Sequence, residues 1–311
     1  MKRRETLPLG VDVGTLRTRV ALVERGASDR PSLIAVASRP TGDEPARAIA
    51  EACAELGTRE RRCVLALRAP NALLRTVAFP PMRARERMRA ARFEAARFIT
   101  YPIGEANVRV AAADGARYVV GIARRDAVGA RVAAAQDAGL RAVAVDDAAL
   151  ALPRAFPYAD ALVDVGEEAT ALVIPDEPIP SVRRFDVGGR ALTAAVAEAL
   201  GVDGATAERR KHTVGLGGAG ERVRDALVEQ LTSALVEHRT GARADVRTIA
   251  IVGNGARLAG FADALERAVA IPVRLGALPA GVSETLPADV VRAASPDWGL
   301  AYGLALWESA A

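Results

Sequence analysis

Residues 11–20 read VDVGTLRTRV, and residues 163–172 read VDVGEEATAL. Each stretch contains an apolar run, an aspartate, one further residue, a glycine, and then a second run that begins near a threonine. A glycine between two short runs of β-forming residues is typical of a tight hairpin, because glycine adopts turn conformations without a steric penalty. The same hairpin written twice, about 150 residues apart, predicts a duplicated structural unit.

The elements around the two hairpins follow the same order. In the first half we predict strands over 7–14, 18–25 and 31–39, followed by a helix over 45–56 that ends at a glycine. In the second half three strands again follow one another, and a helix bounded by glycines comes next. Ligands usually bind where two domains meet. We therefore expect two related α/β domains that present their hairpin tips to one ligand in the cleft between them.

The residues at the hairpin tips are suited to holding a phosphate group and a metal ion. Glycine lets backbone N–H groups approach a phosphate, and a carboxylate at a strand end can hold the waters of a Mg²⁺ ion. A third glycine turn, IVGNGARLAGF at 251–261, follows a strand and opens a helix, where an anion or a purine can rest. Each turn on its own also fits a plain hairpin capped by its aspartate, whereas the three together favour a ligand site. The candidate residues are Asp12, Gly14, Thr15 and Arg19 at the first tip and Asp164, Gly166 and Thr170 at the second.

Residues 70–145 interrupt the repeat and are expected to form an inserted subdomain. An extended stretch leads into a basic helix at about 83–99, and strands at 106–112 and 116–124 and a helix at 125–138 follow. We expect this segment to be compact and to pack beside the first domain. The expected domains are a first domain at 1–69 and 146–159, the insertion at 70–145, and a second domain at 160–311.

The composition indicates a globular protein and excludes several functional classes. The 311 residues exceed the size at which one hydrophobic core usually keeps growing, so two domains are expected. Basic residues outnumber acidic ones by four, but aromatic residues make up only 4% of the chain and are not interleaved with the basic ones. This pattern does not favour nucleic acid as a ligand. Cys53 and Cys63 lack the spacing of a metal site and are expected to be reduced thiols.

The sequence contains no signal for insertion into a membrane. No apolar run reaches the roughly 18 residues that a membrane-spanning helix needs, and the basic start of the chain lacks the apolar stretch of a signal peptide. No amphipathic helix follows residue 308. We therefore expect a cytoplasmic protein.

The motifs, taken in order, resemble those of a known superfamily. The run GVDVGTLRTRV at 10–20, then LVDVGEEATALVI at 162–174, then IAIVGNGARLAGFADALE at 249–266 is similar to the actin-like ATPases. Within that superfamily, RFEAARFITYPIGEANV at 92–108 and the stretch GGRALTAAVAEALGV at 188–202, followed by AERRKHTVGL, resemble the PilM family of type IV pilus assembly proteins. The resemblance covers nearly the whole chain.

The resemblance implies a fold and a ligand. The fold would be actin-like, with duplicated ribonuclease-H-like domains around a nucleotide cleft and a small inserted α/β subdomain, similar to the cell-division protein FtsA. The cleft would hold ATP, with Mg²⁺ bound through water by Asp12 and Asp164. Beyond the two hairpin tips, the positions that match the family are the glycine pair Gly188 and Gly189, then Glu208 and Lys211 beside the ribose and adenine, and Gly253, Gly255 and Arg257 in the adenosine motif.

Two positions depart from the family's pattern. Leu16 and Glu168 stand where the family usually has a small residue, and Glu167 lies beside Glu168. Two carboxylates near a triphosphate would repel it, unless they help to bind the metal or point away from the cleft. These alternatives are open at the level of sequence.

The resemblance also implies a partner. The insertion and the adjacent first domain would hold the short N-terminal cytoplasmic peptide of PilN, a membrane protein, and PilO would be reached indirectly through PilN. ATP would then be a structural or regulatory ligand. Since no general base stands out in the sequence, the chain would be at most a weak ATPase, and no catalytic residue is assigned.

Other functions remain open. One is the cytoplasmic actin-like module of a type II secretion system, similar to GspL, and another is a small-molecule kinase of the same superfamily. A kinase needs a carboxylate base placed against a hydroxyl group, and no such residue stands out. A filament-forming protein is a further alternative.

Overall fold

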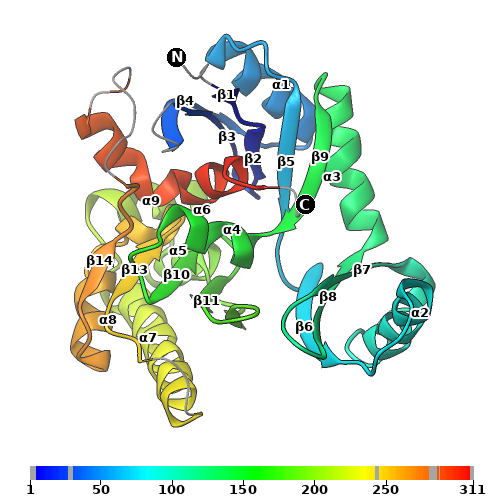
Figure 1. The fold of residues 1–311 in the computed structure, drawn as a ribbon. Helices are drawn as coiled ribbons and strands as arrows, with labels where there is room; N and C mark the ends of the chain where they lie inside the picture. The colour runs from blue at the N-terminus through cyan, green and yellow to red at the C-terminus, as the bar shows by residue number, and fades with distance from the viewer. Residues whose placement is uncertain (1–4, 27–30, 242–244, 280–285, 287, 309–311) are drawn as a thin grey trace.

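The computed structural model describes residues 5–26, 31–241, 245–279, 286 and 288–308. Two β-sheets and a smaller third sheet organise the chain (Figure 1). Within the described residues, no helix is both long enough and apolar enough to cross a membrane.

The first sheet is built from two segments of the chain that are separated by the insertion. Strands β2 to β4 form an antiparallel meander, and β5 and β9 add to it in parallel on the other side of β2. The order is β1-β3-β2-β5-β9, with β4 paired to β3. The strands are β1 (Glu5–Thr6), β2 (Leu9–Val13), β3 (Arg17–Arg25), β4 (Pro31–Pro40), β5 (Arg62–Leu67) and β9 (Arg141–Asp147).

The second sheet repeats this arrangement. Its order is β12-β11-β10-β13-β14, in which β10 to β12 form the antiparallel meander and β13 and β14 are parallel to β10. The repeated hairpin in the sequence therefore corresponds to a repeated sheet. The strands are β10 (Ala161–Val165), β11 (Thr170–Ile174), β12 (Ser181–Phe185), β13 (Ile249–Val252) and β14 (Val273–Leu275).

Helices cover both faces of each large sheet. The outer face of the first sheet packs on α1 (Pro45–Leu56) and α3 (Arg125–Asp137). The outer face of the second packs on α7 (Gly217–Thr240) and α8 (Phe261–Val269), with α5 (Gly189–Leu200) and α6 (Gly204–Thr213) beside them. Because both faces are covered, β2 and β10 are buried at every position, with alternate side chains facing opposite helix layers.

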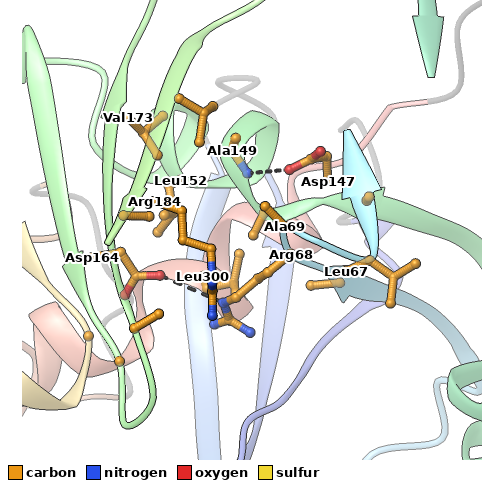
Figure 2. Close-up of a pocket in the computed structure, with 18 of the residues that line it drawn as sticks. Leu67, Arg68, Ala69, Asp147, Ala149, Leu152, Asp164, Val173, Arg184 and Leu300 are labelled. Carbon is orange, nitrogen blue, oxygen red and sulfur yellow. Dashed lines mark hydrogen bonds and ion pairs between the residues drawn. The ribbon is translucent and has the colours of Figure 1, made fainter. Parts of the chain in front are cut away.

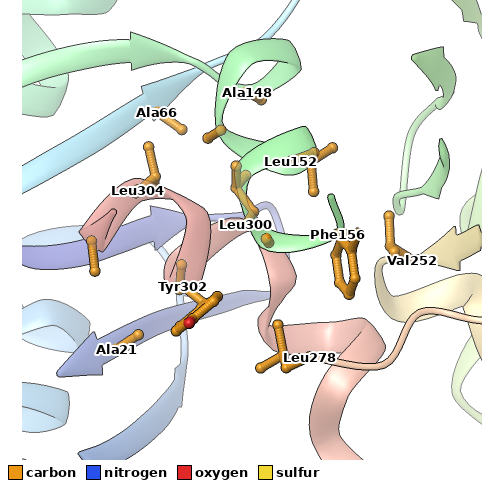
Figure 3. Close-up of a cluster of buried hydrophobic side chains, with 14 of the residues drawn as sticks. Ala21, Ala66, Ala148, Leu152, Phe156, Val252, Leu278, Leu300, Tyr302 and Leu304 are labelled. Atoms are coloured by element: carbon orange, nitrogen blue, oxygen red, sulfur yellow. The ribbon is translucent and has the colours of Figure 1, made fainter. Parts of the chain in front are cut away.

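Two helices lie between the sheets and join the domains. They are α4 (Ala148–Ala155) and α9 (Ala288–Ala305), and their apolar side chains share one cluster with both sheets (Figure 3). Val64 and Ala66 enter it from the first sheet, and Leu162 and Val252 enter it from the second. The domains therefore share a hydrophobic core beneath the cleft.

The inserted subdomain is smaller than the sequence predicted. Its antiparallel sheet has the order β6-β8-β7, and α2 packs on one face around Phe79, Val108 and Ile122. The expected C-terminal boundary at 145 is wrong, because α3 packs on the outer face of the first sheet and β9 pairs in parallel with β5. The elements of the insertion are β6 (Ala72–Ala78), α2 (Ala84–Ala95), the 3₁₀ turn η1 (Ile103–Glu105), β7 (Ala106–Ala112) and β8 (Arg117–Arg124).

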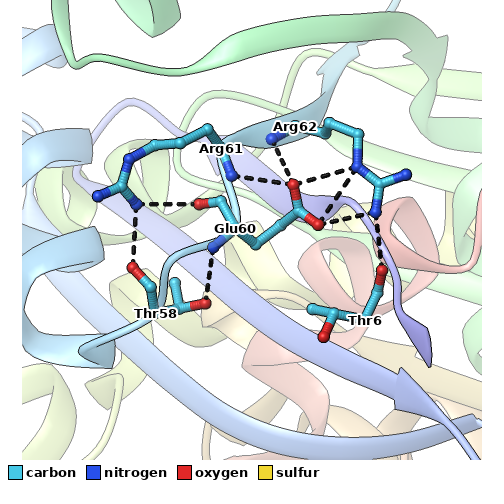
Figure 4. Close-up of polar contacts among 5 residues, drawn as sticks. All are labelled: Thr6, Thr58, Glu60, Arg61 and Arg62. Carbon is cyan, nitrogen blue, oxygen red and sulfur yellow. Dashed lines mark hydrogen bonds and ion pairs between the residues drawn. The ribbon is translucent and has the colours of Figure 1, made fainter. Parts of the chain in front are cut away.

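A polar network fixes the start of β5 (Figure 4). The Glu60 carboxylate accepts hydrogen bonds from the backbone N–H groups of Arg61 and Arg62 and from the Arg62 guanidinium, at 2.7 to 3.2 Å. Arg62 also donates to the backbone carbonyl of Thr6 in β1, at 2.8 Å. Burial alone would raise the pKa of Glu60, but the hydrogen bonds and charge of Arg62 outweigh it and leave the pKa lowered.

Candidate functional site

A cavity of about 1070 Å³ lies between the domains. Its walls come from the carboxyl ends of β2, β5, β9, β10 and β13, from both hairpin tips, and from β6 of the insertion. The carboxyl ends of parallel strands are where α/β folds bind ligands, and the volume suits a nucleotide-sized molecule. The predicted residues that line it are Asp12, Gly14, Thr15, Arg19, Asp164, Gly166, Thr170 and Gly253, whereas Gly188, Gly189, Glu208, Lys211, Gly255 and Arg257 lie outside it.

An arginine that the sequence analysis did not single out lies at the centre of this cleft. Arg68 follows β5, and its Nη1 is 3.1 Å from Oδ1 of Asp12 while its Nε is 3.7 Å from Oδ2 of Asp164. Figure 2 shows Arg68 between the strands and joined to Asp164. Burial alone would lower the pKa of Arg68, but the charges of Asp12 and Asp164 raise it above its usual value. One guanidinium therefore pairs with a carboxylate from each domain.

The two aspartates are nearly covered. Asp12 is 4% exposed and Asp164 is 9% exposed. Burial raises the pKa of Asp164; the charge of Arg68 opposes that rise, and the charge of Asp12 adds to it. Both residues were expected to hold Mg²⁺ through water. In the structure the Arg68 guanidinium contacts both carboxylates.

Arg19 forms a second link across the cleft. It lies on β3 directly opposite Asp12 in the sheet register, and its Nη2 donates to Oδ1 of Asn254 in the second domain. Its side chain is buried, and its Cζ lies 6.0 Å from the ring centroid of Trp298. Burial lowers the pKa of Arg19, and the charge of Asp12 opposes this effect. Arg19, which the sequence predicted to bind phosphate, thus joins the two domains.

The hairpin tips are closed by their own backbone. The Gly14 N–H donates to the carbonyl of Arg17 at 3.1 Å, and the Gly166 N–H donates to the carbonyl of Ala169 at 3.0 Å. The Thr170 hydroxyl donates to the carbonyl of Val187 at 2.7 Å. These three groups satisfy the turns themselves, so the tips have a structural role whether or not an anion binds beside them.

The two glutamates of the second tip are compensated by Arg190 at the start of α5. Its Nη2 is 3.2 Å from the Glu168 carboxylate, and its Nε is 3.8 Å from that of Glu167. Both glutamates line the cleft, although about half of the Glu168 side chain is exposed. Burial raises the pKa of Glu167. The second tip therefore presents carboxylates to the cleft, but a cation lies beside them.

The glycine pair 188–189 is explained by packing against this tip. The N–H groups of Gly189 and Arg190 donate to the carbonyls of Gly166 and Glu167 at 2.9 and 2.8 Å. A Cβ on Gly188 would lie 2.6 Å from the Glu167 carbonyl oxygen. Only glycine allows this approach.

Glu208 and Lys211 pair with each other at the junction of α5 and α6. The Lys211 Nζ is 2.6 Å from the Glu208 carboxylate and donates to the Thr193 hydroxyl at 2.9 Å, and that hydroxyl also contacts Glu208. Lys211 is only 6% exposed. Lys211 is therefore a buried cation that is paired within the protein, beside the second hairpin tip.

The adenosine motif packs under the second hairpin. A Cβ on Gly253, whose φ is +83°, would lie 2.4 Å from Oδ1 of Asp164, and one on Gly255 would lie 2.2 Å from Cγ1 of Val165. Arg257 is within 3.7 Å of the Asp297 carboxylate. These glycines therefore let the 3₁₀ turn η2 (Asn254–Arg257) approach β10.

Asp147 is a further titratable residue of the cleft. It ends β9 and caps α4, where its Oδ1 accepts the Ala149 N–H at 2.9 Å (Figure 2). Burial raises its pKa to about 6, and the charge of Arg68 opposes that rise.

Sequence reasoning missed Arg68 and Asp147, although a signal for both existed. Arg68 follows β5 and Asp147 ends β9, so each lies at the carboxyl end of a strand in the first sheet. Because carboxyl ends of parallel strands meet at one sheet edge, polar residues there belong with Asp12. For Asp147, using the signal required knowing that β9 pairs with β5.

Comparison with known proteins assigns the family. The sequence pattern of the family described as type IV pilus assembly protein PilM matches residues 40–309. The chain belongs to the PilM family. PilM in a solved PilM–PilN type IV pilus biogenesis complex is 28% identical, with a TM-score of 0.84 over 96% of this chain and 97% of that chain. No curated protein matches the chain.

More distant structures show the fold alone. The ethanolamine utilization protein EutJ of Carboxydothermus hydrogenoformans has a TM-score of 0.57 at 16% identity, covering 99% of this chain and 91% of that one. The cytoplasmic domain of EpsL, from the type II secretion system of Vibrio cholerae, has 0.53 at 12% identity, covering 99% and 97%. These likenesses support the predicted actin-like fold.

Proposed function

We propose that this PilM-family chain is the cytoplasmic actin-like component of a type IV pilus inner-membrane assembly complex, and that it binds the N-terminal cytoplasmic peptide of PilN. The observation that carries the proposal is the likeness to PilM of a PilM–PilN complex over almost the full length of both chains. The protein would be cytoplasmic and would lie at the inner membrane through PilN, with PilO reached indirectly. The likeness to EpsL supports the fold only, so a secretion system is not favoured.

The insertion offers a surface that suits an extended peptide. β6 is an edge strand, and its residues Leu74 and Thr76 line the cleft on the sheet face opposite α2. Gly121 of β8 lies opposite Leu74 in the register, and a Cβ on Gly121 would be 3.6 Å from Cδ2 of Leu74, so the Leu74 side chain lies over this glycine. An extended peptide gains affinity from main-chain hydrogen bonds to a strand edge and from a few apolar side chains in a groove. The peptide would bind here, between the insertion and the first domain.

Calorimetry with the full chain and a synthetic PilN N-terminal peptide tests the proposal. We expect micromolar binding, no binding of a scrambled peptide, and at least tenfold weaker binding to Leu74→Arg, because the charge would be placed in the apolar groove. Leu200→Arg is the control, since Leu200 is an exposed leucine that ends α5 in the second domain, whereas Leu74 is half-buried in the cleft. Absence of heat at high micromolar concentration, or equal loss in both variants, would contradict the proposal.

ATP is proposed as a structural or regulatory ligand of the same cleft, bound weakly. The cavity is large enough, but Glu168 adds a negative charge where a phosphate would lie. At about 4–5 Å this repulsion is worth about 1 kcal/mol or more, and 1.4 kcal/mol is a tenfold change in affinity. Glu168→Gly should therefore tighten ATP binding by about tenfold in a fluorescence titration. Looser binding in that variant would show that the carboxylate helps the ligand, and no binding of millimolar ATP by either protein would make the chain a pure adaptor.

A further inference from the structure

We infer that Arg68 takes the place of a divalent cation in this cleft and joins the two domains through Asp12 and Asp164, so that the site does not take up Mg²⁺. This goes beyond the proposed function, which concerns a peptide at β6 and ATP and assigns no role to Arg68.

The geometry supports one shared cation. Asp12 is the penultimate residue of β2 and Asp164 is the penultimate residue of the equivalent strand β10, so the pair is related by the duplication. Two buried carboxylates that face one cleft repel each other and need a positive charge between them. Arg68 contacts both, through Nη1 and Nε respectively.

Arginine can replace the ion because of its shape and its attachment. The guanidinium is planar, always charged, and has five N–H donors, so it can serve two carboxylates at once. Mg²⁺ demands octahedral oxygen ligands and usually keeps several waters. Because the guanidinium is covalently attached to the chain, it cannot dissociate, and the pairing does not depend on the concentration of free Mg²⁺.

The surroundings disfavour an additional dication. Arg19 and Arg131 also lie at this cleft, and the charge of Arg68 contributes to the lowered pKa of each, after burial. Asp147 and Asp297 are the other acidic groups on the walls near Arg68 and Arg19. The three arginines offset all but one of the charges of the four aspartates, so little net negative charge is left for Mg²⁺ to neutralise.

Mn²⁺ binding provides the test, measured by electron paramagnetic resonance on the full-length protein without nucleotide. We expect the wild-type protein to bind no Mn²⁺ at this site up to about 1 mM, and Arg68→Ala to gain one site because the aspartates lose their cation. The double variant Arg68→Ala/Asp12→Asn should lose that site again. Arg75→Ala, which removes another cleft-lining arginine that lies on β6, should gain none. Equal binding by wild type and Arg68→Ala, or a site gained equally in Arg75→Ala, overturns the inference.

A second measurement needs only the wild-type protein. Its thermal unfolding midpoint should be the same within about 1 °C in EDTA and in 10 mM Mg²⁺, because a ligand stabilises a protein only by binding its native state. A rise of several degrees with Mg²⁺ overturns the inference even if Arg68→Ala does not fold. If the variant folds, its midpoint should be lower than that of wild type and should rise with Mg²⁺. Loss of PilN binding would not affect any of these readouts, so the two proposals fail separately.

Discussion

The contact between α9 and β2 can be tested by adding one methyl group. A Cβ at Gly10 would lie 1.8 Å from the carbonyl oxygen of Ala301 and 2.7 Å from the backbone nitrogen of Ala305. Both neighbours are backbone atoms of α9, so no side chain can rotate away. We therefore expect Gly10→Ala to push α9 away from the sheet.

The cost follows from the size of that displacement. Real Cβ atoms essentially never approach closer than 3.0 Å, so α9 must withdraw by at least 1.2 Å, the difference between 3.0 and 1.8 Å. A gap of that size forfeits a quarter to a half or more of the attraction between facing atoms. The residues affected, including Leu300 and Leu304, belong to the core shared by both domains. We expect a loss of about 3 kcal/mol in the free energy of unfolding, at the upper end for overpacked cores.

Urea unfolding followed by circular dichroism measures this loss, and Gly129→Ala is the matched control. Gly129 lies inside α3, and a Cβ there meets nothing within 4 Å. Alanine is favoured over glycine in a helix by about 0.5–1 kcal/mol, so the control should be slightly more stable than wild type. A Gly10→Ala protein within 1 kcal/mol of wild type, or a control that is equally destabilised, would refute the reasoning.

Three further perturbations have signs fixed by the structure. Asp147→Asn should flatten the pH dependence of stability between about pH 4 and 6. Because the pKa of Asp147 is raised in the native state, the wild-type protein should lose up to about 2–3 kcal/mol of unfolding free energy as the pH rises through that window. Unfolding midpoints measured against pH will show this loss, and an unchanged profile in the variant would contradict the prediction. Lys211→Ala should lower the unfolding free energy by about 2 kcal/mol, equally with and without ATP, because the lysine is paired within the protein; loss of ATP affinity alone would instead indicate a ligand contact. Glu60→Gln should lower the free energy of unfolding by about 1–2 kcal/mol at neutral pH, and the difference in urea midpoints should shrink as pH falls below about 4. The reason is that a lowered native pKa gives stability that is present above the unfolded pKa and lost on acidification. A difference that persists at low pH would contradict the prediction.

Much of the fold could be predicted from the sequence because its signals are local. The helix at 45–56 was predicted from its proline and terminal glycine and agrees with α1, and the strands at both hairpins follow from apolar runs bounded by turn glycines. The same local signals placed Asp12 and Asp164 at the cleft. The duplicated hairpin was enough to indicate two related domains, and the resemblance of the ordered motifs implied the actin-like fold.

The domain boundary and the partners of charged residues could not be predicted in this way. The sequence gives no local sign that β9 pairs in parallel with β5, because such pairing joins segments separated by the whole insertion. Lys211 matched a ligand position in sequence, yet it lies buried against Glu208 and Thr193. Which carboxylate a basic side chain contacts depends on packing between elements that are distant in the chain.

The sequence by itself therefore determined the repeated strand–turn–strand units, the aspartates at their tips and the glycines that permit them, since each depends on the conformational preferences of a few adjacent residues. The tertiary structure decided that Arg68 lies between those aspartates. Its position arises only when β5 pairs beside β2 and the shared core of α4 and α9 brings the second sheet against the first. The charge balance of the cleft depends on long-range contacts, and these form only as the two domains pack together.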